Sequence, residues 1–541
     1  MPKKDTLLYS YLENAVVEVQ PQNDVGVFHP KTWLIRFVPE GNDLPIVYRF
    51  LCLSRNLTFD RSWDTVLTLE GELATDRTRA FARNRALGDF YAALPSLTTR
   101  ELPPKISEHI KMLTEEILKV SFEPPPMFDD IDEFMPIGIN GYARGPKLKE
   151  HRRLLVLSPF LSDDALKPLT DYGQDNILIS RLESLDSLSE ETIDKVKERT
   201  QIYSMDDAAE TPENTDNQDQ EAQPPDSSEN LSGLHAKLFI SEEGWNARIL
   251  TGSANATQPA FKGENVEFLT SLTASRSKMG IDAFLDSGDS KYCFRNMLRT
   301  YVRDSKPIET DEVRKQLESD LETSRKILST LGLRLDVSQA SQDKYPLTMS
   351  APRKADGIPA SVTGKCYPIA LSENRANDLS PLRTGSSVVF NDVSLPGLTS
   401  FMAFLLDAEN AGKKLSLSFV LNLPISGLPA ERDKRILHDI IADKGRFLRY
   451  LLMLLAGEDA GNAFLCTFRS DGQSEGNSFS LDFPLLEELV KAYSRHPEKL
   501  DRIASLIADL KESGQDRDLL PEGFESIWQT FMLARKKEGV Q

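Results

Sequence analysis

Alternating apolar and polar residues, interrupted by short polar turns, mark two similar stretches of this chain. The first has apolar runs at 27–35 and 48–53 around a polar turn, and the second has runs at 234–240 and 247–251. Each stretch predicts a strand, a tight turn, a second strand and a polar loop. The internal repeat therefore predicts that the chain contains two related halves.

The segment before the second stretch has its own pattern. The apolar run 154–160 predicts a buried strand, and residues 162–164 predict the cap of a short helix that Pro168 ends. A further strand is predicted at 176–180 and a helix at 189–199. The second half is therefore predicted to be βαβα followed by the strand pair, which is an α/β layer pattern.

The first half has no such opening segment, because His29 lies too near the start of the chain to follow a βαβ unit. Three explanations stay open. The start is truncated, a partner chain completes the sheet, or this half is minimal.

The remainder of the chain predicts a change of architecture. A helical pattern spans about 309–331, β-like runs stand at 387–390 and 415–421, and mainly helical patterns follow from 431. The boundaries predicted from these patterns are a first half at 1–145, a second half at 146–300 with an acidic disordered insert at 205–230, a helical connector at 301–341, a β-containing domain at 342–427 and a helical C-terminal domain at 428–541.

Composition narrows the class of protein. Hydrophobic residues make up 40% of the 541 residues and charged residues 27%, and no apolar run has the length of a membrane helix. The start of the chain has no apolar segment typical of a signal peptide. The four cysteines form no CxxC pair, which argues against a zinc site or a disulfide framework (Cys52, Cys293, Cys366 and Cys466). We therefore expect a cytoplasmic protein that does not work on membranes.

The net charge of −19 is unusual for a protein that handles nucleic acid. Much of the imbalance comes from residues 206–229, which hold many carboxylates and no Lys or Arg. We interpret this segment as a solvated linker, with competition against phosphate for a basic groove as the alternative.

Each of the two similar stretches carries an H-x-K tripeptide and, after the second strand, an S-x-N tripeptide. Since residues two apart in a strand point to the same side, His29 and Lys31 are predicted to project together, and so are His235 and Lys237. If the halves pack around a pseudo-twofold axis, one pocket holds two imidazoles, two ammonium groups and two amides. Such a pocket is a phosphate site with its own acid and base.

These residues resemble the HKD signature of the phospholipase D superfamily, which is HxK followed by GSxN. The second copy matches at His235, Lys237, Gly252, Ser253 and Asn255. The first copy matches at His29, Lys31, Ser54 and Asn56, but has Leu53 in place of the usual glycine and Pro30 within HxK. The resemblance covers about residues 20–275.

The resemblance implies an α/β fold with two phospholipase D-like α/β/α sandwich halves, and a two-step displacement at phosphorus that needs no metal or other cofactor. In that scheme one histidine is the nucleophile and forms a phosphohistidine, while the other protonates the leaving oxygen. By analogy with the family we favour His29 as the nucleophile and His235 as the acid, and the opposite assignment stays open. Lysines and asparagines stabilise charge on the phosphate oxygens, and Asp64 and Glu267 orient the histidines. Ser54 and Ser253 shape the turn or bind the phosphate.

A nucleic acid is the substrate that we favour, with DNA preferred over RNA. No basic amphipathic helix or lipid anchor points to a membrane surface, and residues 54–64 look like bacterial HKD proteins described as nucleases or found near helicases and ATPases. An ATPase or helicase partner in anti-phage defence is thereby suggested, and self-association stays open. The alternatives are a catalytically inactive nucleic-acid-binding or scaffold subunit and a lipid phosphodiesterase.

Other chemically conspicuous residues are given ordinary structural roles. We expect surface positions for His109, His151, His438 and His496. Trp33 and Trp63 are expected in the core, with base stacking as the alternative. A solvated helix face is expected for Arg432, Lys434 and Arg435, with nucleic-acid contact as the alternative.

Overall fold

The computed structural model has a mixed α/β architecture, and the chain divides into two units. We call Val17–Asp311 the motif unit, because it holds both H-x-K tripeptides, and Met1–Val16 with Glu312–Gln541 the sandwich unit. The residues described are 6–23, 25–39, 44–56, 62–74, 80–148, 151–205, 233–286, 293–303, 311–338, 344–441, 447, 450–451, 454–455, 485–495, 497–512 and 524–538.

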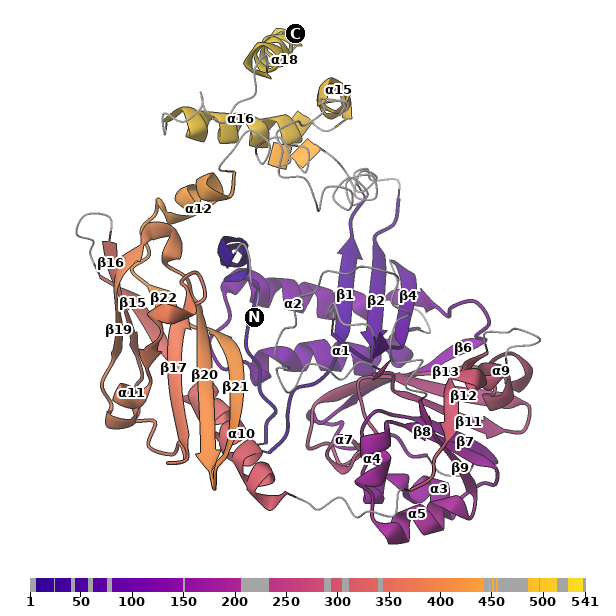
Figure 1. Ribbon diagram of the computed structural model, residues 1–541. Helices are drawn as coiled ribbons and strands as arrows, with labels where there is room; N and C mark the ends of the chain where they lie inside the picture. The colour runs from indigo at the N-terminus through magenta and orange to yellow at the C-terminus, as the bar shows by residue number, and fades with distance from the viewer. Residues whose placement is uncertain are drawn as a thin grey trace, which may run out of the picture. The chain divides into compact units, whose positions relative to one another are not determined.

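An eight-stranded sheet forms the larger part of the motif unit (Figure 1). Its strand order is β14-β9-β8-β7-β11-β12-β13-β6, and β7, β8 and β9 run parallel to one another while the other pairs are antiparallel. The strands are β6 (Asp130–Ile137), β7 (Arg153–Leu157), β8 (Asn176–Ser180), β9 (Thr200–Met205), β11 (Leu238–Glu243), β12 (Asn246–Gly252), β13 (Glu267–Ser275) and β14 (Leu298–Thr300).

Helices cover both faces of this sheet. On β7, Leu154 and Val156 face a core shared with a 3-10 turn (Asp163–Leu166) and with α3 (Lys167–Asp171), α4 (Leu182–Asp186) and α5 (Glu190–Lys197). Leu155 and Leu157 face the opposite core, which contains Ile281 and Leu285 of α9 (Ile281–Leu285). The predictions of strands at 154–160 and 176–180 and of a helix at 189–199 are confirmed. Pro168 was expected to end a helix, but it lies in the first turn of α3, where its missing N–H costs nothing.

The first motif lies in a separate four-stranded antiparallel sheet, β1-β2-β4-β5. Its strands are β1 (Thr32–Phe37), β2 (Val47–Leu53), β4 (Val66–Leu73) and β5 (Val120–Glu123), and the helices packed with them are α1 (Ala80–Leu97) and α2 (Pro104–Ile117). The core of this sheet continues into the large one, since the ring of Phe50 lies 5.5 Å from that of Phe134 on β6 and 5.6 Å from that of Phe268 on β13.

This arrangement differs from the expected pair of equivalent α/β/α halves. The described residues of the first half contain antiparallel pairing in place of a parallel βαβ unit, so only the second half has parallel strands with crossover helices. The boundary expected at 145/146 is also crossed, because β6 pairs with β13 and lies at the edge of the eight-stranded sheet.

The sandwich unit has two four-stranded sheets, β19-β16-β15-β22 and β18-β17-β20-β21, around one core. The strands are β15 (Arg334–Val337), β16 (Lys344–Ser350), β17 (Val362–Pro368), β18 (Asn377–Asp378), β19 (Val388–Ser394), β20 (Phe401–Asn410), β21 (Lys413–Asn422) and β22 (Ile425–Ser426). The predicted helix at 309–331 is confirmed as α10 (Glu312–Thr330), which buries Leu317, Leu321 and Leu328. The predicted end of the connector at 341 is wrong, because 334–337 already pairs with β16.

Helices dominate the described part of the chain beyond 431, as predicted. They are α12 (Arg432–Ile440), α15 (Leu485–Arg495), α16 (Pro497–Glu512) and α18 (Phe524–Glu538). Residues 206–232, which contain almost all of the predicted acidic insert, lie outside the described residues, and so do Cys466 and His496.

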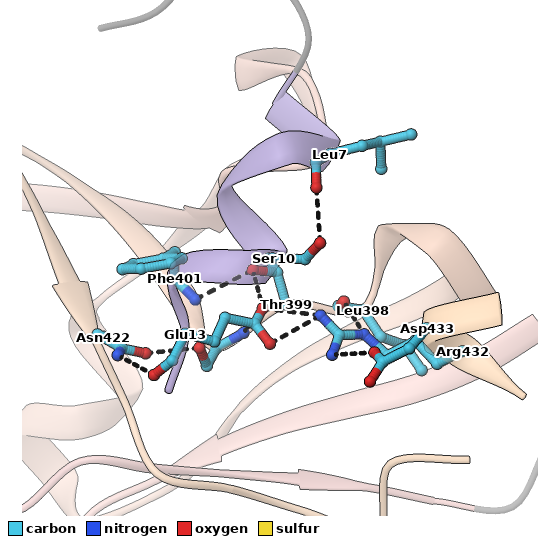
Figure 2. A network of polar contacts seen from close by, with 10 residues as sticks. Leu7, Ser10, Glu13, Leu398, Thr399, Phe401, Asn422, Arg432 and Asp433 are labelled. Carbon is cyan, nitrogen blue, oxygen red and sulfur yellow. Dashed lines mark hydrogen bonds and ion pairs between the residues drawn. The ribbon is translucent and has the colours of Figure 1, made fainter. Parts of the chain in front are cut away.

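Residues 6–16, which we call the N-terminal anchor, belong to the sandwich unit and not to the first half as expected. The anchor begins with a 3-10 helix (Thr6–Leu12), and the next residue, Glu13, is buried (Figure 2). Its carboxylate accepts hydrogen bonds from Arg432 Nη2 at 2.7 and 2.9 Å and from Thr399 Oγ1 at 2.7 Å, and its carbonyl accepts one from Asn422 Nδ2 at 2.7 Å.

This ion pair corrects the expectation for Arg432. Only 4% of Arg432 is exposed, while Lys434 and Arg435 are exposed as expected. A carboxylate from a distant part of the chain allows the guanidinium to be buried, and sequence spacing along one helix does not reveal such a partner.

Candidate active site

Both motifs lie at the ends of strands within the motif unit. In the large sheet, Leu238 at the start of β11 pairs with Leu157 at the end of β7 and with Thr251 near the end of β12. His235 and Lys237 therefore share an edge with the carboxyl ends of β7 and β8, where ligands bind in open α/β sheets. In the small sheet, His29 and Lys31 precede β1 just as Ser54 and Asn56 follow β2.

The H-x-K tripeptides stand in extended segments before the strands, not inside them as expected. The amide of His29 donates to the carbonyl of Val266 at 2.9 Å, and the amide of His235 donates to the carbonyl of Trp63 at 2.9 Å. Short parallel pairings lead into both contacts, between β10 (Gly233–Leu234) and β3 (Ser62–Trp63) and between Phe28 and Val266. Each histidine is thus positioned by the backbone of the other half.

The two lysines occupy equivalent positions. Lys31 Nζ donates to the carbonyl of His29 at 2.8 Å, and Lys237 Nζ donates to the carbonyl of His235 at 2.8 Å and to that of Ser54 at 3.1 Å. Because an ammonium group has three N–H donors, Lys237 keeps one and Lys31 keeps two for an incoming anion. The contact from Lys237 to Ser54 joins the second motif directly to the first.

Glu267 forms the centre of a buried hydrogen-bond network. Its carboxylate, 1% exposed, contacts His29 Nδ1 at 2.9 Å and accepts a hydrogen bond from Ser253 Oγ at 2.5 Å. Because a carboxylate accepts hydrogen bonds, this contact places a proton on Nδ1 and leaves the lone pair of a neutral His29 on Nε2. The expected orienting role of Glu267 is therefore matched by geometry, and the histidine it orients belongs to the other motif.

Asp64 takes the equivalent position in the first motif, but its contacts differ. Its carboxylate lies 2.6 Å from Arg55 Nε and accepts a longer hydrogen bond, at 3.5 Å, from Ser54 Oγ. His235 Nδ1 is buried, and among the described residues it has no hydrogen-bond partner. Asp64 therefore does not orient His235 as expected. Its side chain is one methylene shorter than that of glutamate and is held by the guanidinium.

Ser54 and Ser253 shape their turns in the same way. The hydroxyl of Ser54 accepts a hydrogen bond from the amide of Thr65 at 2.8 Å, and the hydroxyl of Ser253 accepts one from the amide of Phe268 at 3.0 Å. Asn56 is exposed, whereas the Oδ1 atom of Asn255 is buried and has no partner among the described residues. The two amides are thus not equivalent in this structure.

Gly252 and Leu53 begin the two S-x-N turns with different backbones. Gly252 has a φ of +150°, and a Cβ atom there would lie 2.2 Å from the carbonyl oxygen of Phe268. Only glycine fits such a position. Leu53 is a regular residue at the end of β2 and is buried, so the first copy forms its turn without the glycine.

Positive charge is concentrated around His235. Burial lowers its pKa to about 4, and the neighbouring charges of Lys237, Arg181, Arg55 and Lys31 act in the same direction. Burial lowers the pKa of Lys237 to about 7, again helped by Lys31, and lowers that of Lys31 to about 8. An anion bound next to these groups would offset these effects, so the electrostatics favour a bound anion.

Two arginines of this site were missed in the sequence. Arg55 lies inside the first S-x-N tripeptide, a signal that was visible. Arg181 follows β8 and is 5% exposed; its Nε donates to the carbonyl of Leu234, next to His235, at 2.8 Å. Its position at the end of a parallel strand is the only sequence signal for it.

The remaining expectations are only partly correct. His109 is exposed and His438 half-buried, but His151 is 7% exposed and contacts the ring of Tyr172. Trp33 and Trp63 are 46% and 42% exposed, so their expected core positions are wrong. Strand ends at a sheet edge leave large rings partly open to solvent.

The described residues contain no group of three or more His, Cys, Asp or Glu side chains arranged to hold a metal ion. Among the same residues no helix combines the length and apolar character needed to span a bilayer. Neither protein-family models nor curated protein sequences compared with this chain give a match.

Proposed function

We propose that the motif unit is a phosphodiesterase of the phospholipase D type that cleaves nucleic acid, DNA before RNA. The observation that carries the proposal is the interlocked pair of motifs, in which His29 contacts Glu267 of the second copy and Lys237 contacts Ser54 of the first. Two interlocked H-x-K motifs and the surplus of cations that they share suit a phosphodiester more than any neutral substrate.

In the proposed reaction, Nε2 of His29 attacks phosphorus while the bond from phosphorus to the leaving oxygen breaks. His235 transfers a proton to that oxygen, so that an alcohol and a phosphohistidine at His29 result. Water then attacks phosphorus, His235 takes the proton of the water, and the P–N bond breaks to release a phosphate monoester. Glu267 stabilises the positive charge on the phosphorylated imidazole, a role that Asp64 cannot fill for His235 because it pairs with Arg55.

Lys31, Lys237 and the amides of Asn56 and Asn255 stabilise the phosphate oxygens in this scheme. The free donors of both ammonium groups and the amide nitrogen of Asn255, whose Oδ1 is buried, are suited to this role. We also propose that the two motif-bearing halves are phospholipase D-like and related by a pseudo-twofold axis.

The same proposal includes an ATPase or helicase partner, which the sandwich unit would recognise.

Cleavage of labelled single-stranded and duplex DNA and RNA in EDTA tests the proposal. We expect cleavage by the full chain and a loss of at least about a thousandfold in His29→Ala and His235→Ala. His109→Ala, which changes an exposed histidine of α2, is the matched control and is expected to stay fully active. Quenching the reaction of phosphate-labelled substrate in alkaline denaturant, which preserves the acid-labile P–N bond, should leave label on His29.

Two outcomes would replace the proposal by its alternatives. Binding of nucleic acid without cleavage by any preparation would favour an inactive binding or scaffold subunit. Turnover of phosphatidylcholine vesicles in the absence of DNA or RNA cleavage would favour a lipid phosphodiesterase. Cleavage that survives both histidine substitutions would contradict the mechanism itself.

A further inference from the structure

Two large aromatic side chains are exposed on elements that connect to the segment before His235. Trp63 lies on β3, which pairs with β10 directly before His235, and it is 42% exposed. Phe160 follows β7 at the same sheet edge and is 44% exposed. Isolated exposed rings are common on protein surfaces, so their attachment to the site decides what they mean.

Phe160 is attached to both catalytic loops of the second motif. The hydroxyl of Ser158 donates to the carbonyl of Phe160 at 2.8 Å and accepts the amide of Ala256, next to Asn255, at 2.9 Å. The guanidinium carbon of Arg181 lies 5.3 Å from the centre of the ring, and Arg181 in turn binds the carbonyl of Leu234. Phe160 is therefore held in place by residues that also contact the second motif, and its ring is not a mobile surface side chain.

Trp63 is attached to the same histidine through its backbone. Its carbonyl accepts a hydrogen bond from the amide of His235 at 2.9 Å, and it directly precedes Asp64. Its ring makes an edge-on contact with the ring of Phe294, with the ring centres 6.5 Å apart. Both aromatic residues are thus connected to the segment that carries His235.

We infer that these rings form a base-stacking site for single-stranded nucleic acid, in which the nucleotides flanking the scissile phosphate stack on Trp63 and Phe160. This inference rests on the proposed function. Stacking on aromatic side chains is available only to unpaired bases, because the bases of a duplex already stack on one another, and it tolerates any base sequence. The arginine behind Phe160 adds positive charge for the neighbouring phosphate.

The test measures binding by full-length protein with His29→Gln, so that the substrate is not cut. The probes are a fluorescein-labelled single-stranded DNA of about twelve nucleotides, sized to span one binding groove, its RNA counterpart, the same DNA with abasic sites, and the duplex. We expect Phe160→Leu and Trp63→Leu each to weaken binding of the base-bearing single strands about 5- to 150-fold. The same changes should leave binding of the abasic strand unaltered, and Phe160→Tyr should restore binding.

Trp245→Leu is the matched control. Trp245 is 85% exposed but lies in the turn between β11 and β12, at the other end of these strands from His235, so binding should not change. Equal losses for abasic and base-bearing strands, tighter binding of the duplex, or no loss in either variant would each overturn the stacking site. Failure of every probe to bind would remove the proposed function as well. If the unsubstituted protein cleaves nucleic acid but Phe160→Leu and Trp63→Leu do not weaken binding, only this inference is removed.

Discussion

The two motifs have the same backbone plan but different electrostatic surroundings. In both, a lysine binds the carbonyl of its own histidine at 2.8 Å, and the histidine amide binds the other half at 2.9 Å. In the second copy Ala254 stands between Ser253 and Asn255, whereas the first copy has Arg55 in that place. Arg55 holds Asp64, so among the described residues His29 has a carboxylate partner and His235 has none.

Under the proposed function, this difference would divide two roles between identical residues. A histidine that bears a phosphoryl group is stabilised by a nearby negative charge, and of the two histidines only His29 has a carboxylate contact among the described residues. A histidine that donates a proton must first carry it, and since the cations around His235 lower its pKa, the negative charge of a bound phosphodiester would be needed to protonate it. Copies of one motif would thus become nucleophile and acid through their neighbours.

Exchanging the carboxylates for amides should separate the two copies most strongly. Glu267→Gln removes the charge beside His29 and should lower kcat by roughly a thousandfold or more, as happens when the carboxylate of a catalytic histidine is lost. Asp64→Asn should lower it by about tenfold at most, since Asp64 acts through Arg55. Single-turnover cleavage rates measure both, and equal losses would show that the two carboxylates are equivalent.

The pH dependence should show the effect of the cations around His235. In the proposed mechanism His235 must be protonated and His29 neutral, so kcat/KM should give a bell-shaped pH profile. With a pKa of about 4, only a small fraction of the free protein carries the required proton on His235 near neutral pH. A bound phosphodiester offsets the surrounding cations, so the limb that reports His235 should lie at higher pH in the profile of kcat than in that of kcat/KM. Rates measured from pH 3.5 to 8 give both profiles, and identical limbs would show that the bound phosphate does not raise the pKa of His235.

The stability of the protein should depend on Gly252 of the second motif, although the first motif has Leu53 at the equivalent position. Gly252→Ala should destabilise the protein by about 1–3 kcal/mol or more, because the backbone is strained for alanine and the Cβ meets Phe268. Gly141→Ala is the control, since φ there is +83° but no atom lies within 4 Å of a Cβ. Thermal unfolding of both variants separates the backbone cost from the steric clash. Equal destabilisation would mean that the contact with Phe268 does not matter.

Removing the guanidinium should make the two copies more alike. Arg55→Ala deletes a cation that lowers the pKa of His235 and releases Asp64 toward the unpartnered Nδ1. Both changes raise the pKa of His235. The limb of the kcat/KM profile that reports this group should therefore move toward neutral pH by on the order of one unit. Titration of His235 by NMR gives the pKa without any assay of activity. Arg49→Ala, which breaks an exposed ion pair with Glu70 on the same sheet, should leave it unchanged.

Local pattern predicted the strands beside each motif, the buried strand β7 and the helices α5 and α10, because each element depends on its own periodicity. It missed the sharing of β6 between halves and the burial of Arg432, which depend on partners far along the chain. The sequence also indicated Glu267 as an orienting residue. It could not reveal that the oriented histidine lies 238 positions earlier, because that pairing arises only when two sheet edges meet.

The N-terminal anchor has a consequence for the order of synthesis. The partners of Glu13 are Thr399, Asn422 and Arg432, so its carboxylate must wait for nearly the whole intervening chain to be made. At ribosomal speeds of about 5–20 residues per second, that delay is about 20–80 s. The motif unit can fold first, and residues 6–16 leave the ribosome before that unit but reach their final partners after it.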